Sequence, residues 1–381
     1  MRRWWVRLIA ALVVVLVLLV GIVFLVSNTN WGRERVRRYV ENLIQKNSHG
    51  LVHIGSVSGN LLHGIVMHDV VITDSARAPF VKADEIWANY SLNTLIRGKK
   101  IDLRNVKLVR PFIVLDKPPA GKWNYERIFP RDTTTPSGPK KTGWGTWIRF
   151  SDVTLVQGDI TVRAPWEPDP HISAAEQRDA VRKALGPSGR LKILQVAKGY
   201  QKEFSFHKID AIFPLVRLED PAYATRVIDV AALKMIAEPF RPPVADVRGL
   251  TGRFEFTGDS LWWKGARVAF PGTKASGDGK YNIDNGDLHL RLHGDPVDPK
   301  DIRWAMIQLP EQGSGKLDFG LDWTGSKSIY LARNMDVTLE RSHIAGQIEA
   351  IVTDTVAFKD ADLRFANLDT RLITRLFPTM T

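Results

Sequence analysis

The chain has 381 residues, no cysteine, 44% hydrophobic residues, and 53 Lys and Arg against 41 Asp and Glu. This composition excludes a disordered chain, and the missing cysteines exclude disulfides, thiolate metal sites, iron–sulfur clusters and cysteine nucleophiles. Half of the net charge of +12 falls within residues 1–50, on both sides of a hydrophobic run, so we expect a membrane surface and no nucleic acid as the partner of the basic residues.

The hydrophobic run, residues 8–26, holds 19 residues without a charge. As a helix it would be about 28 Å long, close to the ~30 Å hydrocarbon core of a bilayer. We therefore expect a membrane anchor within residues 1–30. Its hydrophobic segment contains Leu8, Val14, Leu19 and Val26. A cleaved signal peptide is the alternative, but its apolar region would be shorter, roughly 7–15 residues. Arginines on both sides leave the orientation undecided by charge alone.

An amphipathic juxtamembrane helix is predicted within residues 31–50, because Val36 and Val40 recur at helical spacing among charged residues. One interpretation places this helix on anionic lipid headgroups. Its contacts would then be Arg33, Arg35, Arg37 and Arg38. The other interpretation is a helix that caps the first strands of the folded domain, and the two are compatible.

Beyond residue 50 the hydrophobic pattern has period two, as in residues 288–293, which indicates strands with one apolar and one polar face. We expect about 18 strands. Turns are expected at Gly277-Asp278-Gly279, Asp284-Asn285-Gly286 and Gly313-Ser314-Gly315. Residues 130–146 are predicted to be a linker, and residues 173–185 a helical insertion that begins with a capping box.

The chain also repeats itself. Residues 103–115 match residues 150–162 at a shift of 47, and a second unit beginning at residue 297 recurs at residue 368. The later copy stops where the earlier one continues into a strand, so we expect the chain to end in mid-repeat. The predicted fold is mainly β, an elongated and curled repetitive sheet over residues 51–129 and 147–381. An ordinary sandwich or barrel is the alternative.

Four segments carry a family resemblance by their order along the chain. They are VKADEI at residues 81–86, SLNTLIRG at 91–98, IDLRNVKLVRP at 101–111 and GKWN at 121–124. Together with the N-terminal anchor they resemble AsmA-like proteins, the TamB group included, over about residues 1–130 and more loosely from residue 246 onwards.

The resemblance implies a protein anchored by one span in the bacterial inner membrane, with its N-terminus in the cytoplasm and its bulk in the periplasm. It implies a β-groove that carries phospholipid towards the outer membrane. The TamB group suggests an alternative, an assembly factor for outer-membrane proteins that works with a barrel partner. A third hypothesis is a membrane-anchored polysaccharide enzyme, because carboxylates are plentiful, although no pair of them stands out.

A curled single-layer sheet would leave apolar side chains on its concave face, where acyl chains could cover them. The predicted lining consists of Phe254, Phe256, Leu288, Leu290, Leu292, Leu317, Phe319 and Leu321. The alternative is that these residues form the packed core of a sandwich. At roughly 4.8 Å per strand the groove would be about 85 Å long. The sequence predicts no catalytic or cofactor site. It predicts no metal site either, because His289 and His293 would lie about 13 Å apart on one strand.

Overall fold

The computed structural model describes residues 29–376, except residues 47, 60–62, 92, 129–146, 171, 188, 284, 326 and 354. The expected linker lies outside the described residues. So does the expected anchor, with Leu8, Val14, Leu19 and Val26. Within the described part of the chain, no helix has the length and hydrophobicity needed to cross a membrane.

The molecule is mainly β, as predicted, and the 19 strands of the described residues form one sheet. The strands are β1 (Leu51–Ser58), β2 (Gly64–Thr73), β3 (Pro79–Tyr90), β4 (Ile101–Val109), β5 (Phe112–Asp116), β6 (Ile148–Trp166), β7 (Ile193–Val196), β8 (Gly199–Glu219), β9 (Arg226–Val230), β10 (Ala232–Glu238), β11 (Ala245–Val247), β12 (Gly249–Thr257), β13 (Ser260–Ala269), β14 (Lys274–Asn282), β15 (Leu288–Val297), β16 (Gly313–Thr324), β17 (Lys327–Leu339), β18 (Ser342–Val352) and β19 (Val356–Ala366). The helices are α2 (Asn30–Lys46), α3 (Asn124–Ile128), α4 (Ala174–Leu185), α5 (Pro299–Ile302), α6 (Thr370–Leu376) and the π-helix η1 (Asn93–Arg97).

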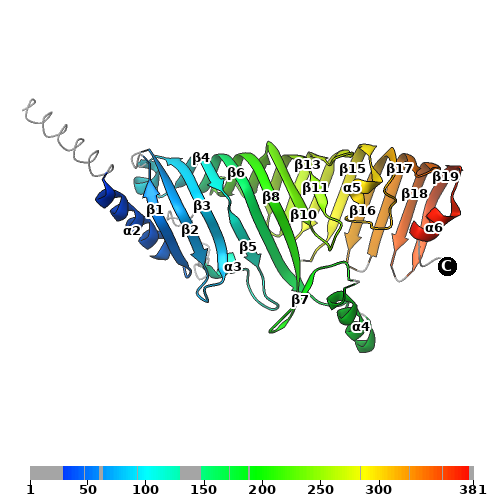
Figure 1. Ribbon diagram of the computed structural model, residues 1–381, viewed down its shortest axis with the longest axis horizontal. Coiled ribbons are helices and arrows are strands. Elements are labelled where there is room, and N and C mark those ends of the chain that lie inside the picture. Colours follow the sequence, from blue (N-terminus) through cyan, green and yellow to red (C-terminus); the bar gives the residue numbers. More distant parts are fainter. Residues whose placement is uncertain are drawn as a thin grey trace, which may run out of the picture.

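Each strand pairs with strands close to it in the chain, so the sheet extends along one axis from β1 to β19 (Figure 1). All pairings are antiparallel except those of β4 and β5 with β6. These parallel pairs join Leu103 to Phe150 and Ile113 to Ile160, each at the shift of 47 residues. The two copies of the first sequence repeat therefore lie side by side.

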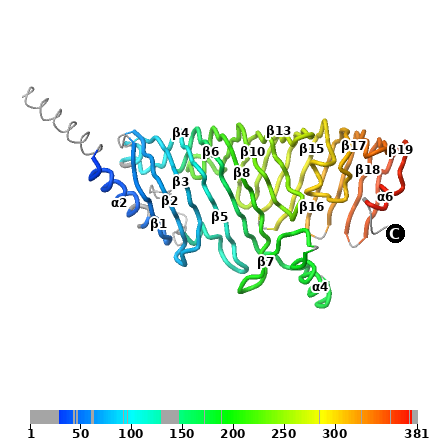
Figure 2. The backbone as a smooth tube through the Cα atoms, in the orientation of Figure 1, coloured from blue at the N-terminus to red at the C-terminus, as the bar shows by residue number. Residues whose placement is uncertain are grey.

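The sheet has two long margins, where its strands end. The upper lip holds the β1–β2, β3–β4, β8–β9, β12–β13, β14–β15, β16–β17 and β18–β19 turns, and the lower lip holds the β2–β3, β13–β14 and β17–β18 turns with α5 and α6. Between the lips the strands bend along their length, so the sheet curves about its long axis, as Figure 2 shows.

Residues in the left-handed backbone conformation interrupt the strands, two of them at equivalent positions in the two copies of the first repeat. Asp69, Asn105 and Asp152 have φ angles of 52°, 49° and 54°, and each precedes a buried valine. Asn334 and Asp360 have the same conformation in β17 and β19, where the strand register shifts. Asn and Asp tolerate this backbone region better than other side chains. Such bulges bend a strand, which accounts for the curvature of the sheet.

One glycine-rich segment that the sequence predicts as a turn lies inside a strand, so that prediction was wrong, and a second such segment is the start of a strand, where the repeat also places it. Gly277-Asp278-Gly279 belongs to β14, and Gly313-Ser314-Gly315 begins β16. A Cβ at residue 279 would lie 2.0 Å from Cζ2 of Trp263. Glycine serves here to admit a neighbouring ring and not to turn the chain. The third predicted turn does connect β14 to β15, with Gly286 at a φ of 80°.

The helical insertion is confirmed as α4, which protrudes below the sheet in Figure 1. The N–H of Glu176 donates to Oγ of Ser173 (3.3 Å), and the N–H of Ser173 donates to the Glu176 carboxylate (2.8 Å). This is the predicted capping box.

The later sequence repeat is also visible in the hydrogen bonds at the lower lip. The N–H of Asp298, before α5, donates to the buried hydroxyl of Thr273 at 2.8 Å. The N–H of Asp369, before α6, donates in the same way to the buried hydroxyl of Ser342 at 2.9 Å. Each aspartate side chain then accepts the N–H two residues further on. Both helices are therefore fixed to the sheet by the same arrangement of hydrogen bonds.

The free edge of β1 is closed by α2, the capping that the sequence offers as one interpretation of this helix. The N–H of Ile54 donates to Glu41 Oε1 (2.8 Å), and Arg37 Nη1 donates to the Ile54 carbonyl (3.1 Å). The N–H of Val52 donates to Gln45 (3.3 Å). Unpaired edge strands promote association between chains, and these side chains satisfy the edge of β1.

The bulges give a first prediction. Asp152→Val places a β-branched side chain in the left-handed region, so we expect a loss of about 1–2 kcal/mol in the free energy of unfolding. Asp152→Asn is the matched control and should stay within about 0.5 kcal/mol of the wild type, because the Asp152 side chain is exposed. Urea-induced unfolding measures both, and equal stability of the two variants would contradict the role given to the bulge.

Candidate functional site: an apolar sheet face

One face of strands β12–β19 is apolar from strand to strand. Cross-strand neighbours form a continuous row, each residue opposite the next. The row is Phe254, Trp263, Gly279, Leu290, Leu321, Tyr330, Ala350 and Phe358. A second row runs beside it towards the upper lip. It is Phe256, Leu261, Tyr281, Leu288, Trp323, Ser328, Val352 and Val356. We call this surface the apolar face.

Five of the eight residues predicted to line a groove belong to these two rows, and the other three, Leu292, Leu317 and Phe319, continue the apolar face at alternate positions of β15 and β16. Leu290 is opposite Leu321, and Leu292 is opposite Phe319. Phe254 and Phe256 belong to the same rows on β12, which β13 and β14 separate from β15. Each of the eight side chains is half-buried. The structure therefore brings the predicted set together on one surface.

The most exposed members of this face are not among the residues predicted from the sequence. Trp323 is 50% exposed, Tyr330 41%, Phe358 46% and Val356 58%. The alternation in β19 could have identified Val356 and Phe358, but the bulge at Asp360 breaks the period of two within that strand. Trp323 ends the alternating run of β16 and carries the same signal as Leu321.

The corresponding apolar side chains of the first strands are packed. Ile54 is fully buried, Val70 is 4% exposed and Val106 is 6% exposed, all within one cluster of strands β1–β4, β6 and β8. Val36 and Val40 of α2 contact this cluster, and its other members are strand residues. The sheet and α2 together enclose these side chains, and we infer that this face is the concave one. Its exposure rises from the packed end at β1 to the open end at β19.

A Trp263 ring lies flat on the backbone of Gly279 within the apolar face. An added Cβ at Gly279 would fall within 2.0–2.6 Å of three atoms of that ring. Phe254 lies next to it, with ring centroids 6.3 Å apart. The absence of a side chain at residue 279 keeps the aromatic ring low on the sheet, so the face stays level between Phe254 and Leu290.

The lower part of the apolar face is covered by α6. Leu372 is 2% exposed and packs against Val337 and Leu339, with Met335 and Ile344 beside them. Asp369 and Ser342 hold the start of this helix in place. The exposed rows thus lie nearer the upper lip.

The opposite face of the same strands is polar. His289 contacts Asp322 at 3.0 Å, His293 contacts Asp318 at 2.7 Å, and Arg291 donates to Asp322 at 2.6 Å. The hydrogen bond from Arg291 lowers the pKa of Asp322, and the hydrogen bond with His293 lowers the pKa of Asp318. Each histidine uses a separate carboxylate. Among the described residues, no three His, Asp or Glu side chains are arranged to hold a metal ion.

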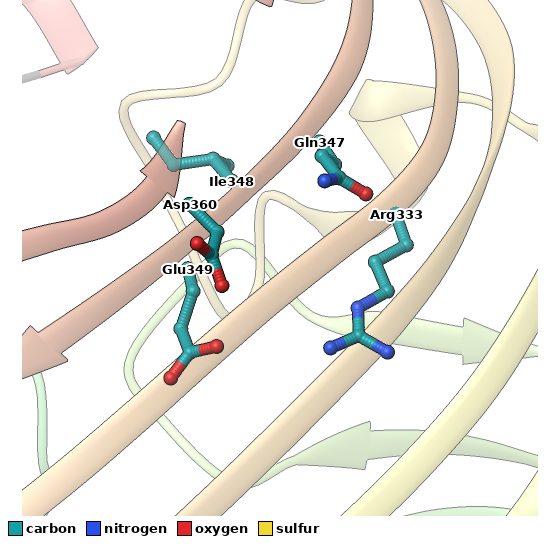
Figure 3. Close-up of a pocket in the computed structure, with 5 residues that line it drawn as sticks. All are labelled: Arg333, Gln347, Ile348, Glu349 and Asp360. Atoms are coloured by element: carbon teal, nitrogen blue, oxygen red, sulfur yellow. The ribbon is translucent and has the colours of Figure 1, made fainter. Parts of the chain in front are cut away.

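A shallow pocket of about 200 Å³ lies where β17, β18 and β19 bend (Figure 3). It is lined by Arg333, Gln347, Ile348, Glu349 and Asp360. Figure 3 shows the two carboxylates close together and the guanidinium across from them. The pocket follows from the bulge at Asp360, and its charged lining makes it unsuited to an acyl chain.

The four arginines predicted to contact lipid headgroups differ in their surroundings. Arg37 is held by Glu34, Glu41 and the edge of β1, so it is not free for a headgroup. Arg33 is half-buried. Arg35 is exposed and lies over the ring of Trp31, and Arg38 is exposed with a 3.4 Å contact to Glu34. Two of the four are therefore available for contact with a surface.

Comparisons of this chain with protein-family models, with curated proteins and with solved structures find no match.

The polar face gives a prediction of pH dependence. The pKa of Asp322 is lower in the folded chain than in the unfolded one. Its contribution to stability is therefore present above the unfolded pKa of about 3.9 and is lost as the pH falls towards the folded pKa. We expect the free energy of unfolding to fall less between about pH 6 and pH 3 in Asp322→Asn than in the wild type. Arg291→Gln removes the partner and should have the same effect, whereas an unchanged pH profile in both variants would contradict the assignment.

Proposed function

We propose that the chain is an AsmA-like envelope protein whose apolar face shields the acyl chains of phospholipid and conducts them between the inner and outer membranes, without catalysis. The observation that carries the proposal is the row of exposed apolar side chains, with Trp323, Tyr330 and Phe358 between 41% and 50% exposed. Contiguous apolar surface of this kind is rare on soluble proteins unless a ligand or partner covers it.

Acyl chains suit this face better than a compact ligand does. The apolar rows cross eight adjacent strands, from Phe254 to Phe358, and the residues on them are aliphatic and aromatic. Hydrocarbon removed from water is stabilised by about 0.8 kcal/mol per CH₂ group, without directional contacts. A long flexible chain can therefore lie along the rows in many positions, which is the property that a conduit needs.

The cellular placement belongs to the same proposal. We infer an inner-membrane anchor with the N-terminus in the cytoplasm and the bulk in the periplasm, from the hydrophobic run and the family resemblance. The exposed side chains of α2 support a location at the bilayer surface: Trp31 and Tyr39 are 59% and 60% exposed, and Arg35 and Arg38 lie among them. Aromatic and basic side chains together favour the headgroup region.

A specific observation supports the alternative, an assembly factor for outer-membrane barrel proteins. β19 pairs with β18 on one side, and its residues are exposed along nearly its whole length of 11 residues. Among the described residues no strand occupies its other edge. An open edge can pair with an incoming strand. α2 protects the opposite end of the sheet from this reaction.

Placing a charge on the apolar face tests lipid binding. We expect phospholipid to co-purify with the wild type and at least about tenfold less with Leu290→Asp or Phe319→Asp, because burying a carboxylate beside an acyl chain is strongly unfavourable. Native mass spectrometry measures the bound lipid. The control is Ser276→Asp, which adds the same charge on the polar face, opposite Arg267 and His293.

Circular dichroism should show the folded sheet in all three variants. A wild type without bound lipid, or a Ser276→Asp variant that loses lipid equally, would contradict the proposal.

Photo-crosslinking separates the two candidate functions. We expect a photoreactive residue at Tyr330, on the apolar face, to form adducts with phospholipid in intact cells, because this side chain is exposed there. A probe at Lys359, on the polar face of the edge strand β19, should capture lipid at least about fivefold less. Barrel-protein adducts from both positions, with no lipid adducts from Tyr330, would favour the assembly factor instead.

A further inference from the structure

The first half of the upper lip is on the same side of the sheet as the start of α2. Arg37 donates a hydrogen bond to the Ile54 carbonyl, and Gln45, further along α2, accepts one from the N–H of Val52, which comes earlier in β1. The helix α2 therefore runs antiparallel to β1. Its first residues therefore lie towards the β1–β2 turn, on the lip that also holds the β3–β4 turn and the start of β6. In Figure 1 α2 lies at the left-hand end of the sheet, beside β1, with its first residues uppermost.

This half of the lip is basic on balance, since the β8–β9 turn holds Arg217 and Arg226 against Glu219 and Asp220 and the other segments add an excess of cations. Residues 91–104 hold four Arg and Lys against one Asp. Arg97, Lys99 and Lys100 are exposed, and Arg149 is exposed at the start of β6. Within the described chain, Arg97, Lys99 and Arg149 form no ion pair with a carboxylate. Their charge is therefore available to a partner.

Aromatic side chains accompany these cations. Lys100 lies over the ring of Trp147, 5.3 Å from its centroid, and Arg217 lies over Tyr223 at 3.8 Å. Arg217 is also directly opposite Arg149 across strands β8 and β6. Like charges opposite one another are unfavourable, and an anion beside them relieves the repulsion. The Nε of Arg217 is buried and has no hydrogen-bond partner among the described residues.

The second half of the same lip has the opposite character. Its turns between β12 and β15 carry Asp259 and Asp287, and the β16–β17 turn precedes the single cation Lys327. The basic residues are thus concentrated at the end of the lip nearest α2, which is not expected of charges placed only for solubility.

We propose that the basic lip, formed by Arg97, Lys99, Lys100, Trp147, Arg149, Arg217 and Tyr223, lies on the anionic phospholipid surface of the membrane that holds the N-terminal anchor. Anionic headgroups attract Lys and Arg side chains that lie near the bilayer surface, and aromatic rings favour the same depth. The proposal rests on the membrane anchor of the proposed function. It adds that the sheet contacts the bilayer along this lip, so that the open part of the apolar face extends away from the membrane.

The test uses the full chain reconstituted in vesicles in which about a third of the lipid is phosphatidylglycerol. The chain has no cysteine, so Lys99→Cys carries a single fluorophore on the basic lip, and Asn285→Cys is the matched position on the acidic half of the same lip. Nitroxide-labelled headgroups quench a fluorophore that lies at the bilayer surface. We expect quenching at residue 99 to exceed that at residue 285 at least about fivefold, and to fall in neutral vesicles or at about 0.5 M salt.

Charge reversal supplies the second measurement. Lys100→Glu with Arg149→Glu should reduce quenching of the residue 99 label towards the level at residue 285, while the chain still floats with the vesicles. Equal quenching at both labels in a chain that floats would overturn the basic lip alone. Failure of the chain to float would instead overturn the anchor, and with it both proposals. If the basic lip bound a polynucleotide in preference to the vesicles, the proposal that it lies on a phospholipid surface would also be overturned.

Discussion

The structure depends on one constraint: a single-layer sheet has an apolar face and no second layer to cover it. Near β1 the sheet wraps around its own side chains, and Ile54 reaches full burial. At the lower lip α6 covers part of the face through Leu372. Beyond these regions Trp323, Tyr330 and Phe358 remain largely exposed. Exposed apolar surface often marks a binding site, and we propose acyl chains as its cover because hydrocarbon burial needs no directional contacts.

The bend that makes the face concave is set by local chemistry. Asn105 and Asp152 lie at equivalent places in two repeats and adopt the left-handed conformation, which bulges the strands there. Because β4 and β6 pair in parallel at the repeat shift, the two bulges lie next to each other. A sequence repeat is thereby converted into a line of bends across neighbouring strands, and the sheet curves about its length.

Patterns of period two were sufficient to predict strands with one apolar and one polar face, but they did not identify Trp323 and Tyr330 as exposed members of the apolar face. Capping chemistry was sufficient to predict α4 at Ser173. The glycines of β14 were misassigned because a turn and a close contact need the same residue, and only the position of Trp263 distinguishes them. The hydrogen bonds from Glu41 to the edge of β1 could not be predicted either, because they join a helix and a strand that local patterns treat separately.

Charged side chains, like the apolar ones, divide into those that stabilise the sheet and those that remain exposed on its surface. Within α2, Arg37 and Glu41 satisfy the edge of the sheet, while Arg35 and Arg38 face outward. Further along, cations gather on the first half of the upper lip, and paired His and Asp side chains stabilise the polar face between β15 and β18. The charged side chains therefore serve two structural purposes, at the edge of β1 and on the polar face, and we propose that the remaining two groups contact a membrane surface.

The central claim is that phospholipid covers the apolar face, and two adjacent residues of β18 test it most directly. Ala350 belongs to the apolar row. Glu349 is on the polar face, where its cross-strand partner is Lys359. A polarity-sensitive fluorophore on Ala350→Cys should shift to shorter wavelength when phospholipid is added to delipidated protein, and the same fluorophore on Glu349→Cys should not shift. Equal shifts at both positions, or no shift at residue 350, would contradict the account.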